Sequence, residues 1–73
     1  MISAWALSRL LKKKLHERDM NPRAFAMFIG MNDDHLRKLY NGQLNPGTAA
    51  VRRICEGLDI DFEETMKLIV VDE

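Results

Sequence analysis

Four groups of turn-forming residues divide this chain into short segments, and this division limits the fold more than any other feature of the sequence. The groups are Asn21-Pro22, Gly30, Asn41-Gly42 and Asn45-Pro46-Gly47. Proline and glycine interrupt regular structure, and asparagine favours caps and turns. Between the groups, apolar residues recur at spacings of three and four, which is typical of helices, and no convincing strand alternation is found. The sequence therefore predicts an all-α fold of short helices.

Five helices joined by tight turns are expected. Their predicted ranges are residues 3–18, 22–29, 33–40, 48–58 and 61–70. Short polar side chains stand where N-caps are needed, because their oxygens can accept hydrogen bonds from the free amides of a first turn. The predicted N-caps are Asn21, Asn32, Thr48 and Asp61. A chain of 73 residues is expected to form one domain, a compact five-helix bundle over residues 1–73.

The formal net charge of the chain is zero, with 11 basic and 11 acidic residues. The charges are unevenly distributed, because residues 1–38 carry a net charge of +4 and the remainder carries −4. The composition therefore lacks a strongly basic domain, which is the simplest indication of nucleic-acid binding. A local basic surface in the first half of the chain remains compatible with these numbers.

Membrane and secreted proteins do not fit the composition. The longest aliphatic run, Leu68-Ile69-Val70-Val71, is far too short to span a bilayer. Cys55 is the single cysteine and cannot form an internal disulfide. A reducing compartment, the cytoplasm, is therefore expected.

Catalytic and metal-binding constellations are not evident either. Cys55 falls on an inward apolar stripe and is expected to be a core thiol, and His16 and His35 complete no metal-ligand spacing with it. The run Asp33-Asp34-His35 lies at an exposed helix start with no nucleophile nearby. We expect no enzyme, no metal and no other cofactor.

The motif over residues 22–41 predicts two short helices joined by a glycine-led turn. Ala26 is small enough to let two helices approach closely, and Gly30 can adopt the backbone of the turn. An apolar wedge between the helices is expected from Phe25, Ile29, Met31, Leu36 and Leu39. This arrangement is the helix-turn-helix, in which the second helix is presented outward to a DNA major groove.

In these segments the chain resembles the phage-repressor and Cro-like (Xre-type) helix-turn-helix family, and its lambda-repressor variety in particular. The resemblance runs from about Leu7 to Met66, and it rests on the order and spacing of several short pieces. They are Phe25-Ala26, Ile29-Gly30-Met31-Asn32, Leu36-x-x-Leu39-Tyr40-Asn41-Gly42, Asn45-Pro46 and Ile54-Cys55-x-Gly57-Leu58-Asp59-Ile60. The resemblance implies a five-helix bundle that binds double-stranded DNA, usually as a homodimer on a near-palindromic operator.

The resemblance also implies a set of DNA-contacting positions. The start and outer face of the second motif helix would meet base edges, and Asn41 and the start of the first motif helix would hold phosphates. These positions are Pro22, Arg23, Asn32, Asp33, Asp34, His35, Arg37, Lys38 and Asn41. Helix N-termini attract phosphates through free amides and the helix dipole, and cationic side chains add charge-assisted contacts. The run Lys12–Lys14 is either a further phosphate contact or a solvated helix face.

Asp33 and Asp34 depart from the family pattern, since Gln, Ser, Thr or Arg are common at these positions. Carboxylates near phosphates are repulsive, and cytosine N4 is the good partner for them in the major groove. Three interpretations remain open for this pair. It compensates charge at a helix N-terminus, reads cytosine or rejects wrong sequences, or abolishes DNA binding.

Two sets of apolar residues have no assigned place in the motif. Met27 and Phe28 either pack inward or form an exposed patch for a protein partner. Trp5 and the tail residues either cap the small core or form the interface of a homodimer. These tail residues are Ile69, Val70 and Val71.

The sequence thus predicts a sequence-specific DNA-binding transcriptional regulator of the phage repressor or Cro type. The alternative is a protein-interaction module of the same fold, such as an antitoxin or an accessory protein. In that case Asp33 and Asp34 would block DNA, and Met27 with Phe28 or the tail would bind a protein.

Overall fold

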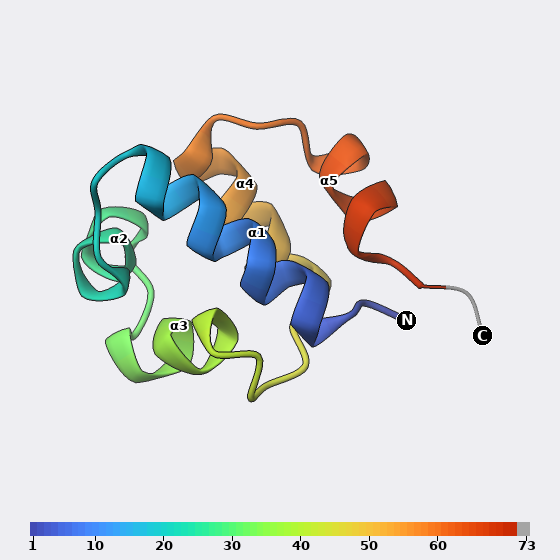
Figure 1. The fold of residues 1–73 in the computed structure, drawn as a ribbon, viewed down its shortest axis with the longest axis horizontal. Coiled ribbons are helices and arrows are strands. Elements are labelled where there is room, and N and C mark those ends of the chain that lie inside the picture. Colours follow the sequence, from blue (N-terminus) through green and yellow to red (C-terminus); the bar gives the residue numbers. More distant parts are fainter. Residues whose placement is uncertain (72–73) are drawn as a thin grey trace.

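This computed structural model describes residues 1–71 of the chain. These residues contain five α-helices and no β-strand. In chain order the helices are α1 (Ala4–Glu17), α2 (Pro22–Ile29), α3 (Asp33–Tyr40), α4 (Thr48–Leu58) and α5 (Phe62–Ile69). The predicted all-α fold is confirmed, and every helix begins and ends within a residue or two of its predicted range. Figure 1 shows α3 along one edge of the molecule, below α1, with α5 at the end where the two termini lie.

Short polar side chains cap four of the five helices, because each supplies an oxygen to an amide of the first turn. Ser3, Asn21, Asn32 and Asp61 accept from the backbone N–H three residues later, at 3.1, 2.8, 3.2 and 2.9 Å. The prediction that Thr48 caps α4 is wrong. Gly47 is the N-cap, and its carbonyl accepts the first bond of the helix from Val51 at 3.1 Å. Thr48 already has a helical backbone, so its hydroxyl is not placed to cap.

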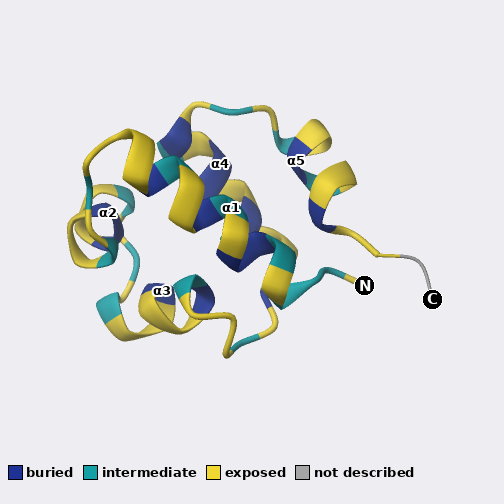
Figure 2. Cartoon of the chain, viewed as in Figure 1, coloured by how far each residue is buried: buried dark blue, intermediate teal, exposed yellow. Residues whose placement is uncertain are grey.

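The apolar stripes of the helices meet in one continuous core. Leu7, Leu11 and Leu15 of α1 are fully buried, and Cys55 of α4 is a buried free thiol, as expected. Figure 2 shows the buried stripes of the helices turned inward and the exposed positions turned to solvent. The remaining buried hydrophobic residues are Phe25, Ala26, Leu36, Leu39, Val51, Ile54, Leu58 and Ile69.

The two ends of the chain lie side by side. Ile2 and Val70 form an isolated antiparallel bridge, the Ser3 N–H donates to the Ile69 carbonyl at 2.7 Å, and the Val71 N–H donates to the Met1 carbonyl at 2.9 Å. The Ile69 side chain is 1% exposed and packs in the core of its own chain, which for this residue favours core packing over a partner surface. Val70 and Val71 remain exposed at the paired ends.

Helices α2 and α4 approach closely because Gly57 of α4 has no side chain. A Cβ atom built on Gly57 would overlap the Cγ2 methyl of Ile29 and would lie 3.2 Å from the Phe25 ring. The contact fixes α2 against α4, and α2 in turn packs against α3. None of the described helices is long and apolar enough to cross a membrane.

Replacing Gly57 with Ala is expected to destabilise the fold by about 1–3 kcal/mol, because the added methyl overpacks the α2–α4 contact. The gain in helix propensity, about 1 kcal/mol, offsets part of this loss. Urea unfolding followed by circular dichroism measures the change. In a Gly57→Ala chain, Ile29→Ala is expected to cost less than in the parent, since it removes the overlapping methyl. Equal costs in the two backgrounds would contradict the proposed steric contact.

Candidate nucleic-acid interface

The turn between α2 and α3 depends on a left-handed glycine. Gly30 has φ 70° and ψ 31°, a conformation that glycine adopts without a steric penalty. The Met31 N–H donates to the Ala26 carbonyl at 2.9 Å, which closes the end of α2. Asn32 then caps α3, so three residues, Gly30 to Asn32, connect the two helices. The predicted helix-turn-helix geometry is present.

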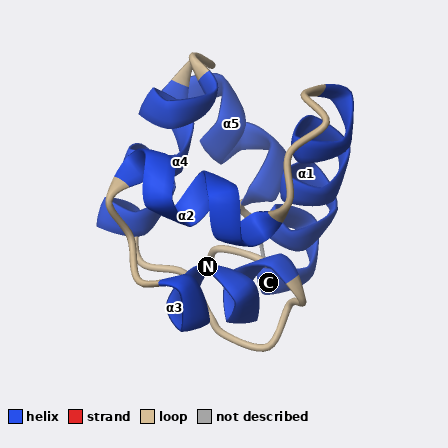
Figure 3. Ribbon diagram, turned by 90° about the vertical axis from the view of Figure 1, so that its left-hand side faces the viewer, coloured by secondary structure: helices blue, strands red, loops and turns tan. Residues whose placement is uncertain are grey.

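The two faces of α3 differ sharply. Leu36 and Leu39 are buried against the body of the protein, where α3 packs on α1 and α2. The opposite face carries polar and charged residues at the surface. The exposed positions are Asn32, Asp34, His35, Arg37, Lys38 and Asn41, and Asp33 is half-buried. Figure 3 shows α3 at the lower edge of the molecule, below α2, with no other helix covering it from below.

Two ion pairs run along the outer face of α3. Arg37 donates to Asp33 Oδ2 at 2.6 Å, and Lys38 Nζ lies 3.2 Å from Asp34 Oδ2. Residues four apart in a helix face each other, so each carboxylate of the first turn meets a cation of the last. The formal charge of α3 is therefore zero. Its two cations are already engaged by carboxylates of their own helix, which sequence reasoning did not foresee.

The two carboxylates of α3 have different surroundings. The Asp34 side chain is 72% exposed, whereas that of Asp33 is 36% exposed. Asp33 Oδ1 is shielded from solvent and has no hydrogen-bond partner among the described residues. Asp33 is thus partly shielded from solvent, and Asp34 is largely exposed although it is paired with Lys38.

The start of α2 offers fewer backbone donors than a usual helix N-terminus. Pro22 has no N–H, and the Ala24 N–H is used by the Asn21 side chain. The Phe25 N–H donates to the Asn21 carbonyl at 3.1 Å. This leaves the N–H of Arg23 for an external acceptor, together with the exposed Arg23 side chain.

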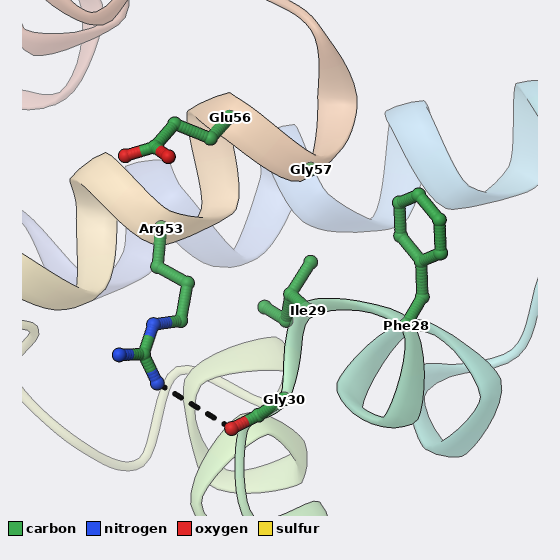
Figure 4. Close-up of a pocket in the computed structure, with 6 residues that line it drawn as sticks. All are labelled: Phe28, Ile29, Gly30, Arg53, Glu56 and Gly57. Atoms are coloured by element: carbon green, nitrogen blue, oxygen red, sulfur yellow. Dashed lines mark hydrogen bonds between the residues drawn. The ribbon is translucent and has the colours of Figure 1, made fainter.

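Arg53 of α4 reaches the same region from outside the motif. Its Nη1 donates to the Gly30 carbonyl at 3.4 Å, as Figure 4 shows. It also lines a hollow of about 280 Å³ with Asn32 and His35 at the start of α3. Sequence reasoning missed this residue because it lies beyond the motif, and the fold alone brings it to the turn. Among the described residues, Arg23 and Arg53 are paired with no carboxylate.

Of the run Lys12–Lys14, Lys12 is the residue that contacts α3, at its last residue, Tyr40. Lys14 lies 3.8 Å from Glu17, and Lys12 lies over the Tyr40 ring, 5.7 Å from its centre. Lys12 and Lys13 also line a groove between α1 and α5. No group of three or more metal-ligating side chains occurs among residues 1–71.

Four large apolar side chains, two on α2 and two beside the α1–α5 groove, are exposed. Met27 is 74% exposed and Phe28 is 69% exposed, so neither packs into the core, although the Phe28 ring lies 6.5 Å from that of Phe25. Trp5 and Leu68 are 67% and 72% exposed on the walls of the α1–α5 groove, which has a volume of about 650 Å³. Arg9 stacks on the Trp5 ring at 4.8 Å.

The model of the Cro/C1-type helix-turn-helix DNA-binding domain matches residues 10–70. This match covers most of the chain. The chain belongs to the Cro/C1-type helix-turn-helix family. The resemblance inferred from the motif is therefore confirmed, and the matched range contains α2, α3 and Arg53. Neither the curated proteins nor the solved structures provide a match.

Replacing Asp34 with Asn is expected to lower the free energy of unfolding by only about 0.5–1 kcal/mol, since exposed helical ion pairs and first-turn carboxylates each contribute little. A double-mutant cycle with Lys38→Gln, measured by thermal unfolding, is expected to give a coupling of about 0.3–0.5 kcal/mol. A coupling near 2 kcal/mol would mean that the pair is part of the folded framework and unavailable to a ligand.

Proposed function

We propose that this protein is a sequence-specific transcriptional regulator that acts on double-stranded DNA in the cytoplasm and reads the major groove with α3. The observation that carries the proposal is the two-sided character of α3. Its inner face is fixed by Leu36 and Leu39, and its outer face is polar and uncovered. A helix held in this way behind a tight turn can enter the major groove without rearrangement of the domain.

The proposed roles follow from the charges around α3. Arg23, Arg53 and the Asn41 side chain contact the phosphates on either side of the groove, because these exposed polar groups flank the helix. Arg37 and Lys38 add to them only if they turn from their carboxylates toward the DNA. Phosphate contacts then fix the register, and α3 supplies the contacts to the bases.

A homodimer is the proposed assembly, because two such helices about 34 Å apart would match successive turns of the major groove. We propose the α1–α5 groove as its interface. Trp5 and Leu68 give it an exposed apolar wall, and Arg9, Lys12 and Lys13 give it a basic one. Glu64 lies one helical turn before Leu68 on α5. When Leu68 of a second copy enters the groove, Glu64 of that copy comes close to the basic wall formed by Arg9, Lys12 and Lys13.

A protein-interaction module is the second candidate function, and the exposure of Met27 and Phe28 favours it. Two large apolar side chains that stand together on an exposed helix face are typical of a docking surface. Duplex DNA distinguishes the two candidates, since a protein-interaction module of this kind has no affinity for duplex at low or moderate salt.

Duplex affinity is expected to fall steeply with salt. If four phosphates are held, the loss between 50 and 200 mM salt is about 100-fold. Arg53→Ala is expected to reduce the slope of log affinity against log salt by about one. Arg52→Ala is the matched control, because Arg52 stacks on the Phe62 ring at 4.3 Å. Fluorescence anisotropy with a labelled duplex measures both slopes. Absence of any duplex binding by the parent would remove DNA reading as the function.

Trp5→Ala and Leu68→Ala are expected to raise the dimer dissociation constant at least about tenfold, since each removes a large apolar contact of the proposed interface. Sedimentation equilibrium of the intact chain measures the constant. Met27→Ala is the control, because Met27 is equally exposed but lies on α2. A parent chain that stays monomeric both free and on a duplex with two half-sites would refute the dimer.

A further inference from the structure

The outer face of α3 presents a hydrogen-bond donor beside a hydrogen-bond acceptor. Lys38 Nζ and Asp34 Oδ2 are 3.2 Å apart, and their side chains are 52% and 72% exposed. A lysine ammonium is a donor with no acceptor, and a carboxylate is an acceptor with no donor. The ion pair therefore places two unlike hydrogen-bonding groups side by side at the surface that the proposed function turns toward DNA.

We infer that Asp34 and Lys38 act together as the reader of one G·C base pair. Lys38 donates to the N7 and O6 acceptors of guanine, and Asp34 accepts from the N4 amine of the paired cytosine. These acceptors and this donor are neighbours on the major-groove edge of a G·C pair. The inference rests on the proposed function and narrows it to operators that carry a G·C pair beneath this part of α3.

The pairing also explains how a carboxylate can sit at the DNA surface. Asp34 alone would be repelled by phosphates, and Lys38 alone would bind any phosphate it reached. As a pair they have no net charge, so they contribute little affinity for random duplex. Only a base edge with complementary groups repays the removal of water from both. Asp34 thus serves as a specificity-determining residue: it discriminates between base pairs and adds little to the affinity for DNA.

The neighbouring Asp33–Arg37 pair is less suited to this role. It is shorter, at 2.6 Å, and the Asp33 side chain is only half as exposed as that of Asp34. The Asp33 Oδ1 atom is shielded from solvent, so this carboxylate cannot offer both oxygens to a base. Asp33 therefore provides a control within the same helix that carries the same charge and the same type of ion pair.

The test is selection of bound sites from a random duplex library at moderate salt, with the intact parent chain and with Asp34→Asn, Lys38→Gln and Asp33→Asn. The parent is expected to enrich a site with a G·C pair at one position. Asp34→Asn and Lys38→Gln are both expected to reduce the preference at that position about tenfold or more, and Asp33→Asn is expected to keep it. Asp34→Asn should also bind random duplex more tightly than the parent does. Thermal unfolding verifies that each variant is folded.

The outcomes separate the inference from the function on which it rests. One base-pair position in the selected sites is the one at which Asp34→Asn changes the preference. If the parent prefers A·T at that position, or has no preference there, the inference is overturned and DNA reading is left intact. A G·C preference that Asp34→Asn does not reduce would also overturn it. If the folded parent binds no duplex at low salt, the proposed function fails, and the inference fails with it.

Discussion

The burial of Leu36 and Leu39 is the interaction on which the rest of this structure depends. Two leucines on one face of an eight-residue helix hold α3 against α1 and α2, because a helix of this length is not stable alone. The same burial decides which side chains remain outside. The exposed polar face of α3 is therefore a consequence of the core, and its orientation is as rigid as the packing beneath it.

The chain of contacts that supports α3 runs through α2 to α4. Gly57 lets α2 sit close to α4, and the left-handed Gly30 then directs the chain into α3. Arg53 links the same two parts by its hydrogen bond to the Gly30 carbonyl. A helix outside the motif therefore contributes both the support for the turn and an unpaired cation beside it.

The ion pairs on α3 neutralise the charges of this helix within the helix itself. A net charge of zero gives little general attraction to nucleic acid, and the pairs extend that neutrality to the helix itself. Under the proposed function, non-specific affinity comes from the flanking arginines, Arg23 and Arg53. In the same proposal, selectivity comes from matched groups on the bases, since a neutral donor and acceptor pair gains little from phosphates. The proposal thus assigns affinity and specificity to different residues, the arginines beside α3 and the paired side chains on it.

Local signals in the sequence were sufficient for the helices, the caps at Asn21, Asn32 and Asp61, and the turn at Gly30, because these depend on neighbours within a few residues. The prediction of a Thr48 cap failed because Gly47, in extended conformation, is the N-cap and Thr48 is already the first helical residue. Periodicity identified the buried face of α3 as well. Only the tertiary structure decided that Ile69 belongs to the core, that Phe28 stands in solvent, and that Arg53 lies beside the turn. These outcomes depend on which helices meet across the bundle, and the spacing of residues along one helix carries no information about its distant neighbours.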